Sequence, residues 1–399
     1  MSGTERAAHL AAEAPAIRNW IISDGLEGTS LAALLAGFAE RVITAGLHLS
    51  RAYLASPAVH PEIRAVNITW RAATGVVREG VEHGRFPDTF DASPIASMLA
   101  SNVARRRWRL DRPESRDGFA LLDELHAAGD TDYAAHIVRF GGSATTALLG
   151  VALTVCTDLP QGFAPEELAF LNELVPPLAL AVYRIALFDM TTGILDAYVG
   201  HDAGRRILNG EIRRGHGDRL PAAIMIADLR GFTAASEAGG EELIARLGEH
   251  LAAIAEPIEA TGGEILKFLG DGLLAGFPIT NDLGPDPACK AAISAATAAI
   301  ARNDAVNAAH DGRSLPVDIG LHRGEVFYGN VGGGSRLDFT VIGPAVNEAS
   351  RIEALCGVLD RSLLMSADFA HCCGHATVSL GLHRLRGVSE PREIFGLAD

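Results

Sequence analysis

Cysteine is scarce in this sequence. Only 5 of the 399 residues are cysteines, an odd number without the CxxC or Cys/His spacing of metal sites. We therefore expect neither a disulfide framework nor a zinc site, and we expect a reducing, cytoplasmic compartment. The adjacent Cys372 and Cys373 are interpreted as packed or inert residues rather than as a redox switch.

Positive charge is also in short supply. The 34 lysines and arginines stand against 49 aspartates and glutamates, which gives a formal net charge of -15, and no basic stripe interrupts the acidic surface. Such a surface repels a nucleic-acid backbone. Nucleic acid is thus excluded as a partner, whereas a small anionic ligand in one local pocket is not.

Long hydrophobic runs are missing as well. No stretch reaches the ~18 consecutive apolar residues that a membrane span needs, and the best candidate, residues 175–188, is interrupted by Arg184. The N-terminus has no apolar segment of the kind found in secretory signals. We expect a soluble protein without a membrane partner, whose 48% hydrophobic residues and length suit two or three globular domains.

The first half of the chain alternates helical and strand patterns. Apolar spacing predicts helices over residues 31–47, 93–102, 118–127 and 165–188, and strands over 47–55, 62–72, 133–140 and 147–157. This order resembles a GAF-type sensor domain. The resemblance implies an α/β sensory domain over residues 1–186, followed by a helical connector over residues 187–218.

The second half has a different order. An apolar run at 222–228, a helix at 241–260, a hairpin around Gly270-Asp271-Gly272, an Ala-rich helix at 291–309 and a strand with a turn at 317–332 follow one another. A further strand and a helix begun by Pro344 come next. The order β-α-β-β-α-β predicts a ferredoxin-like α+β domain.

Two carboxylates stand at the ends of predicted strands. Asp228 ends the buried run and Asp271 lies in the hairpin turn, so we expect the two to face each other at one sheet edge. This is the arrangement that Mg²⁺ prefers, with phosphate oxygens completing its shell. Alone, Asp228 also fits a helix N-cap and Asp271 a turn residue. The turn at Gly231 would present backbone N–H groups to phosphates.

Asn347 and Arg351 are spaced to share one face of the helix that Pro344 begins. An arginine neutralises charge that develops on a phosphoryl group, and an asparagine fixes a sugar oxygen. The alternative is a solvated helix face. His250 and His322 show no partner pattern and are interpreted as structural or surface residues.

Three motifs together identify a family. IADLRGFT, EILKFLGDGLLAGF and FTVIGPAVNEASRIE resemble the catalytic domain of class III nucleotidyl cyclases in order and spacing, and we assign that domain to residues 219–399. The resemblance implies a dimer with composite active sites and two Mg²⁺ or Mn²⁺ per site. It implies metal ligands, phosphate contacts and catalytic groups at Asp228, Leu229 and Asp271, at Gly231, Phe232 and Thr233, and at Asn347 and Arg351.

Base recognition follows from hydrogen-bond polarity. Adenine N1 is an acceptor, so the donor Lys267 suits ATP, whereas guanine N1–H would need an acceptor. Thr340 stands where the family more often has Asp, resembles the class IIIb subset, and would accept from the adenine 6-amino group. The alternative for Lys267 is an exposed strand lysine. Val388 stands where the family commonly has a phosphate-binding lysine, and Arg386 or Arg392 are candidate substitutes.

The predicted function is an adenylate cyclase that converts ATP to 3′,5′-cyclic AMP and pyrophosphate, under control of the N-terminal half. An unknown small molecule or protein would act on that half. The alternatives are a catalytically silent nucleotide-binding signalling module and a guanylate cyclase. The N-terminal half could also be a protein-interaction scaffold rather than a ligand sensor.

Overall fold

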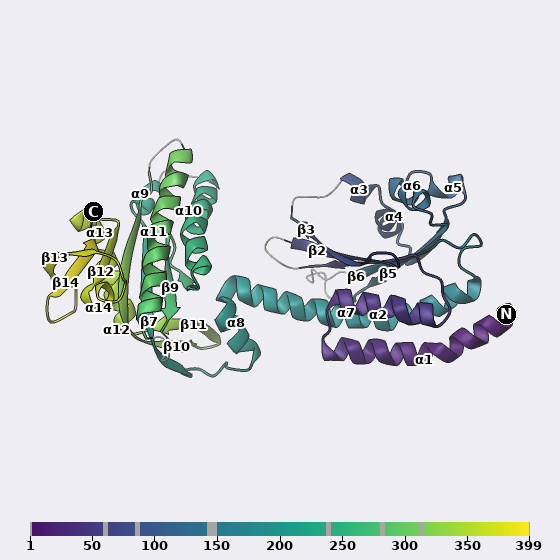
Figure 1. The fold of residues 1–399 in the computed structure, drawn as a ribbon, viewed down its shortest axis with the longest axis horizontal. Helices are drawn as coiled ribbons and strands as arrows, with labels where there is room; N and C mark the ends of the chain where they lie inside the picture. Colours follow the sequence, from purple (N-terminus) through teal and green to yellow (C-terminus); the bar gives the residue numbers. More distant parts are fainter. Residues whose placement is uncertain are drawn as a thin grey trace. The chain divides into compact units, whose positions relative to one another are not determined.

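The computed structural model describes residues 2–58, 63–83, 88–141, 150–236, 241–279, 284–310 and 314–398. The chain folds into two compact units, Met1–Ala197 and Tyr198–Asp399 (Figure 1). The division falls inside the stretch 187–218 that the sequence pattern marks as a connector.

The N-terminal unit is one sheet with helices on both faces. Its elements are α1 (Gly3–Glu27), α2 (Leu31–Thr44), β1 (Arg51–Pro57), β2 (Ile63–Arg71), β3 (Gly75–Glu82), α3 (Asp88–Asp91), α4 (Pro94–Ala100), β4 (Arg105–Arg109), α5 (Pro113–Arg116), α6 (Ala120–Ala127), β5 (Asp132–Arg139), β6 (Gly150–Thr157) and α7 (Pro165–Val199). The strands lie in the order β3-β2-β1-β6-β5-β4. The predicted helices and strands are confirmed, whereas α1, β3 and β4 are elements that the periodicity did not reveal.

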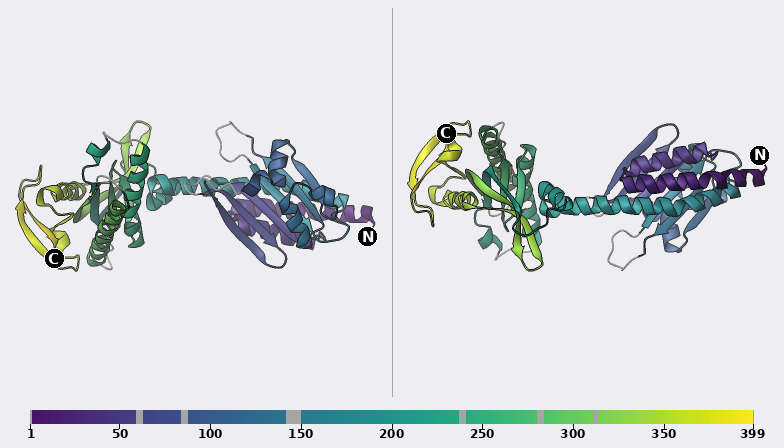
Figure 2. Two further views of the ribbon diagram at one scale, coloured as in Figure 1. Left: turned by 90° about the horizontal axis from the view of Figure 1, so that it is seen from above. Right: turned by 90° about the horizontal axis from the view of Figure 1, so that it is seen from below.

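Strand alternation divides the N-terminal unit into two cores. In β1, Leu54 points to the face covered by α1, α2 and α7, and its neighbour Tyr53 points to the face covered by α4 and α6. Figures 1 and 2 show α1, α2 and α7 running alongside one another. The long helix α7 therefore has one face built into the N-terminal core.

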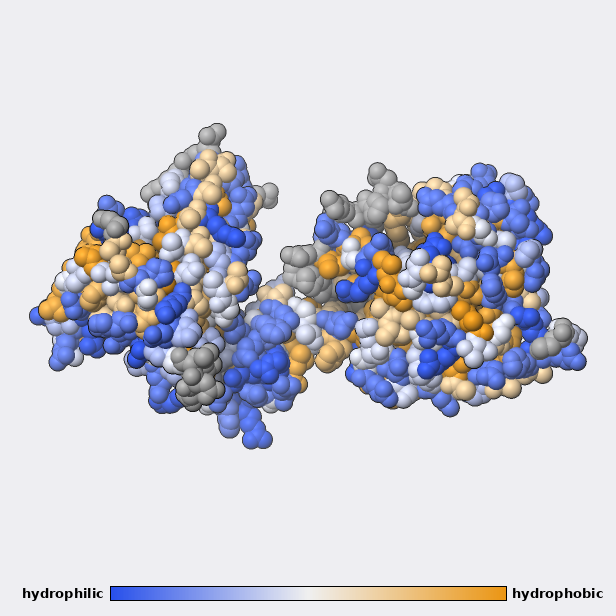
Figure 3. All heavy atoms as spheres, viewed as in Figure 1, coloured by the Kyte–Doolittle hydropathy of each residue, from blue (hydrophilic) through white to orange (hydrophobic). Residues whose placement is uncertain are grey.

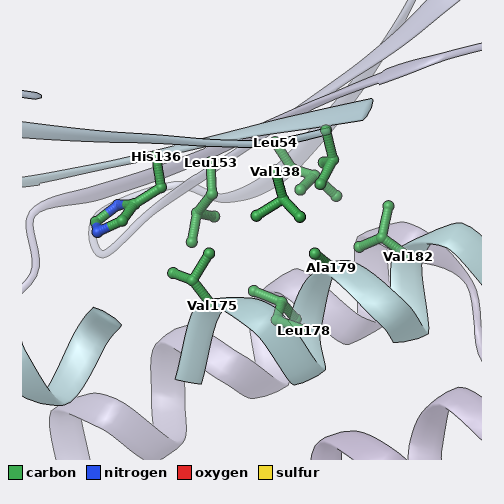
Figure 4. A pocket seen from close by; sticks show the side chains of 9 residues that line it. Leu54, His136, Val138, Leu153, Val175, Leu178, Ala179 and Val182 are labelled. Carbon is green, nitrogen blue, oxygen red and sulfur yellow. The ribbon is translucent and has the colours of Figure 1, made fainter. Parts of the chain in front are cut away.

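Among the described residues, α7 is the one helix long and apolar enough to cross a membrane by length and composition. Its inner residues, Leu171, Leu174 and Leu178 among them, are buried against the sheet. Figure 4 shows that contact, with His136 of β5 beside a small apolar cavity of about 10 Å³. The apolar character of α7 thus serves the core of this unit.

The C-terminal unit contains α8 (His201–Leu208), β7 (Gly217–Leu229), α9 (Phe232–Ser236), α10 (Glu241–Ala260), β8 (Glu264–Phe268), β9 (Gly272–Pro278), α11 (Asp286–Ala309), β10 (Val317–Gly333), β11 (Arg336–Ile342), α12 (Pro344–Glu353), α13 (Cys356–Leu359), β12 (Leu363–Ser366), α14 (Ala367–Ala370), β13 (Thr377–His383) and β14 (Arg392–Leu397). The sheet has eight strands in the order β13-β14-β12-β10-β7-β9-β8, with β11 paired to β10. On the face seen in Figure 3, apolar residues gather over β13 and β14.

The predicted ferredoxin-like unit is confirmed. The elements β7, α10, β8, β9, α11 and β10 follow in the order βαββαβ, and β7 lies between β9 and β10, antiparallel to both. Alternate residues of β7 face opposite ways: Met225 packs under α10 and α11, and Ile226 packs on the side of β11 and α12. Residues 317–332 form one continuous strand rather than the predicted strand with a turn, because β10 pairs with β7 from Val317 to Gly329 and with β11 from Phe327 to Gly333.

The cysteine prediction is wrong at one pair. Cys289 of α11 and Cys372 after α14 form a disulfide across 83 residues of sequence, a proximity that no spacing rule reveals. Both residues are buried, and Cys373 stays a buried thiol. The histidine interpretation is confirmed as structural: His250 contacts Asn303 Oδ1 and His322 contacts Ser366 Oγ, all four side chains being buried.

Candidate active site

The two predicted metal-binding carboxylates meet at one end of the sheet. Asp228, near the end of β7, lies opposite Gly272, the first residue of β9, which Asp271 precedes. A Cβ atom on Gly272 would come within 2.6 Å of Asp228 Oδ1, so the Asp228 side chain lies directly over this glycine. Gly270, with φ of +78°, gives the hairpin its turn. The backbone thus leaves space for two adjacent carboxylates.

The electrostatics of this end are strongly acidic. Burial, and then the negative charges of Asp271 and Asp318, together raise the pKa of Asp228 to about 6. A cation between the carboxylates would relieve this repulsion, and an all-oxygen donor set suits Mg²⁺ or Mn²⁺. In the described part of the chain no group of three or more His, Cys, Asp or Glu side chains is arranged to hold a metal. The residues present therefore fit a metal held by two carboxylates and by phosphate oxygens.

Two further acidic residues, missed from the sequence, join this pair. Asp318 of β10 is the cross-strand partner of Asp228. Glu353, at the end of α12, has its pKa raised to about 7 by burial and then by the charges of Asp228, Asp318 and Asp271. The β7–β10 register that brings Asp318 here is a long-range pairing without a local sequence signal, although Glu353 could have been suspected from its place two residues after Arg351.

The turn after β7 carries the predicted phosphate contacts. The Leu229 side chain is buried in the core, so only its backbone carbonyl is available to a ligand. Gly231 has φ of +82°, which a side chain would strain, and the short helix α9 begins at Phe232. The exposed Thr233 completes the turn. All four residues stay next to Asp228 along the chain.

The two predicted base-recognition residues converge on β11. Lys267 Nζ of β8 donates to Asp338 Oδ2 at 2.9 Å. In β11, Phe339 packs on Tyr328 in the core, so its neighbours Asp338 and Thr340 point to the opposite face. Lys267 is thus held beside the strand that carries Thr340. Asp338, which the sequence analysis missed, fixes this arrangement.

The two predicted catalytic residues lie on the outer face of α12. Ala345 and Ala349 of this helix are buried, Asn347 is exposed and Arg351 is half-buried. A Cβ atom on Gly387 would lie 3.5 Å from Arg351 Nη2. Arg351 therefore lies beside the loop that contains Val388, where a phosphate-binding lysine was sought.

The candidate substitutes for that lysine differ in their surroundings. Val388 is partly buried and packs in the small core that includes Ile352 and Leu385. Arg392 Nε lies 3.4 Å from Glu348 Oε1, on the helix that carries Asn347. Arg386 is exposed.

Comparisons with known proteins agree with this geometry. Residues 218–373 match the family described as "Adenylate and Guanylate cyclase catalytic domain". An adenylate cyclase of Anabaena cylindrica is 43% identical over 136 residues, which are 33% of this chain and 26% of that protein. Adenylate cyclase 1 of Rhizobium meliloti is 29% identical over 254 residues, 61% of this chain and 36% of that protein.

The matches are partial on the side of the relatives. The chain spans between about a quarter and a third of the length of these two curated proteins. Among solved structures, the adenylyl cyclase CyaB from P. aeruginosa is 27% identical with a TM-score of 0.42, over 46% of this chain and 96% of that one.

Proposed function

Because residues 218–373 constitute a class III nucleotidyl cyclase catalytic domain, we propose that this protein converts ATP to 3′,5′-cyclic AMP and pyrophosphate. The observation that carries the proposal is the meeting of Asp228 and Asp271 over Gly272 at the end of the sheet. Two adjacent carboxylates that repel each other contribute little to stability and form a good cation site.

The metal part of the site uses Asp228, Asp271 and the Leu229 carbonyl. These groups would hold two Mg²⁺ or Mn²⁺, which lower the pKa of the ATP 3′-hydroxyl and neutralise the triphosphate. The backbone of Gly231, Phe232 and Thr233 lies next to this point and would orient the phosphates. No protein nucleophile is needed, because the 3′-oxygen attacks the α-phosphorus in line with the leaving pyrophosphate.

The base part of the site selects adenine. Lys267 donates to adenine N1, and Thr340 accepts from the 6-amino group through its hydroxyl. Asp338 takes one of the three N–H donors of Lys267 and leaves the others for the base. An acceptor such as Glu in the place of Lys267 would be required for guanine, which disfavours the guanylate cyclase alternative.

Arg351 and Asn347 act on the sugar and the transition state. Arg351 stabilises the charge that develops around the α-phosphorus, and Asn347 orients the ribose. Arg386 and Arg392 are the candidates for contact with the terminal phosphates in place of the usual lysine. Arg392 already neighbours Glu348, which leaves Arg386 as the more available of the two.

The active form is a homodimer with composite sites. Asp228 and Asp271 act from one protomer, while Lys267, Thr340, Asn347 and Arg351 act from its partner. The large apolar side chains Phe268 and Leu269 are 52% and 46% exposed, immediately between Lys267 and Asp271. A second copy of the chain would cover them.

The N-terminal half regulates this reaction. Residues 1–186 form a GAF-like sensory domain and residues 187–218 a helical connector, and a small molecule or protein of unknown identity supplies the input. Because α7 belongs to the N-terminal core and leads toward α8, a change in its packing would bias dimer geometry. We place the protein in the cytoplasm, where ATP is available. The disulfide does not conflict with this, since both of its cysteines are buried away from soluble reductants.

One assay separates the proposal from its alternatives. Purified full-length protein is incubated with ATP or GTP and with Mg²⁺ or Mn²⁺, and the products are identified by mass. Cyclic AMP from ATP supports the proposal. Cyclic GMP as the main product would establish the guanylate cyclase, and nucleotide binding without any cyclic product would establish the silent signalling module.

A further inference from the structure

Asp318 occupies an unfavourable position beside the metal-binding pair. It lies directly opposite Asp228 in the antiparallel β7–β10 ladder, so the two side chains share one face of the sheet. Its side chain is 8% exposed. Like charges directly opposite each other on a sheet are destabilising, so Asp318 needs a compensating charge.

Arg230 supplies that charge with a two-pronged contact. Arg230 Nε donates to Asp318 Oδ2 at 2.8 Å and Nη2 donates to Oδ1 at 2.6 Å. The Arg230 backbone N–H donates to the Pro316 carbonyl at 2.8 Å, which anchors the arginine one residue beyond the end of β7. Both oxygens of Asp318 are therefore turned toward Arg230. In the described part of the chain no cation pairs with Asp228, and the charged group that acts on it most strongly is Asp271.

We propose that Arg230 and Asp318 are positioning residues that set the affinity of the catalytic metal site. Arg230 withdraws the Asp318 carboxylate from the cation, so that Asp228 and Asp271 bind it without the added charge of Asp318. The affinity of carboxylate sites for divalent cations follows the number of charged ligands. The inference rests on the proposed function, since it takes Asp228 and Asp271 as the metal ligands.

The proposal predicts that the two single variants change the Mn²⁺ affinity in opposite directions. Arg230→Met frees the Asp318 charge and should tighten Mn²⁺ binding, by about tenfold for one unit charge near a divalent ion. Asp318→Asn leaves Arg230 with the exposed Asp360, 3.7 Å away, as its remaining ion-pair partner, and should weaken Mn²⁺ binding by a similar factor because the buried compensating charge is lost. The double variant Arg230→Met/Asp318→Asn should return close to the wild-type affinity. A purely structural role of the pair would weaken binding in both single variants.

The test is a Mn²⁺ titration of the full-length protein without nucleotide, followed by electron paramagnetic resonance of the free ion. Opposite shifts in the two single variants support the proposal, and shifts of the same sign, or none, overturn it. If Arg230→Met does not fold, Arg230→Gln replaces it, because glutamine removes the charge but still donates a hydrogen bond to Asp318.

A separate control tells this inference apart from the proposed function. Asp228→Asn should abolish Mn²⁺ binding, so that the free-ion signal keeps the intensity it has without protein. If wild-type protein and Asp228→Asn bind Mn²⁺ alike, the proposed metal site is wrong. Suppose instead that Asp228→Asn loses Mn²⁺ binding but the Arg230 and Asp318 variants do not change the Mn²⁺ affinity in opposite directions. The proposed function then stands and this inference falls.

Discussion

Buried carboxylates are treated differently in the two units. In the N-terminal unit, the fully buried Asp132 accepts from Nε and Nη2 of Arg107 and from the Phe163 N–H. In the C-terminal unit, Asp228 lies among Asp271, Asp318 and Glu353, and Arg230 pairs with Asp318 rather than with Asp228. A carboxylate paired with an arginine contributes to the structure. A cluster of carboxylates without enough cations costs stability and indicates a binding site for a positively charged ligand.

The strongest test of this contrast removes the surplus charge. Asp228→Asn and Asp271→Asn should each lower cyclase activity by about a thousandfold or more, because a metal ligand is lost. The melting temperature of the metal-free protein should stay the same or rise, since repulsion is relieved. Activity is measured as cyclic AMP formed, and unfolding by calorimetry. Near-normal activity in either variant would contradict the two-metal site.

A second test concerns an exposed ion pair within the site. Lys267→Glu should lower ATP turnover on the order of a hundredfold, because a carboxylate would then face the acceptor N1 of adenine. Its stability should change little, since the Lys267–Asp338 pair is about half exposed. The rates with ATP and GTP are compared with those of the wild type. Unchanged ATP kinetics would make Lys267 an ordinary surface lysine.

The ion pair between Asp132 and Arg107 should respond in the opposite manner, with a loss of stability and little loss of activity. Asp132→Asn should destabilise the N-terminal unit by about 3 kcal/mol, because Arg107 loses its buried partner. Denaturant unfolding measures this loss. The chemical step should survive at temperatures where the variant stays folded, since Asp132 belongs to the N-terminal unit and every residue of the proposed active site belongs to the C-terminal unit. A thousandfold loss of activity in the folded variant would remove the distinction between the two kinds of carboxylate.

A mixing experiment tests whether Arg351 of one protomer completes the active site that contains Asp228 of the other. Asp228→Ala and Arg351→Ala are each expected to be inactive as homodimers. In a heterodimer both lesions fall in one composite site and the other site is intact. If half of the dimers are mixed, about a quarter of wild-type activity should return. Heterodimers that form without any activity would show that each site is built within one chain.

The smallest expected effect is a matched pair of pH responses. Burial lowers the pKa of His136 and of His250, and each ring donates one N–H to an asparagine oxygen, on Asn172 and Asn303. The unfolded chain takes up protons below about pH 6.5 that the folded rings resist. Stability is therefore present above that pH and is lost as the pH falls.

The control for this response is His136→Gln with His250→Gln. Melting temperatures are recorded from neutral to mildly acidic pH for the wild type and the double variant. The double variant should lose less stability on acidification. An equal loss in both proteins would assign the acid sensitivity to other groups.

Local patterns predicted the parts of the site that lie on local elements. Spacing in the sequence predicts Asp228 at a strand end, Asp271 in a glycine turn, and Asn347 and Arg351 one helical turn apart. Asp318, Asp338 and the partner of Cys289 are not, because each is placed by pairing or packing between segments far apart in sequence. Helix α1 was not predicted, because the stripe that it buries is narrow and two of its five residues, Ala14 and Gly25, carry little apolar signal; the other three are Leu10, Ile17 and Ile21.

The bond between Cys289 and Cys372 closes part of the C-terminal unit into a covalent ring. The ring contains Asp318, Thr340 and Arg351, whereas Asp228 and Asp271 precede it in the chain. A protease that cuts once between Cys289 and Arg351 leaves a nicked chain that still migrates as one piece under non-reducing electrophoresis. Reduction would then release two fragments, one with the carboxylates and one with the arginine. After such a cut the metal-binding aspartates and Arg351 lie on different backbone fragments, and the disulfide alone joins these fragments covalently.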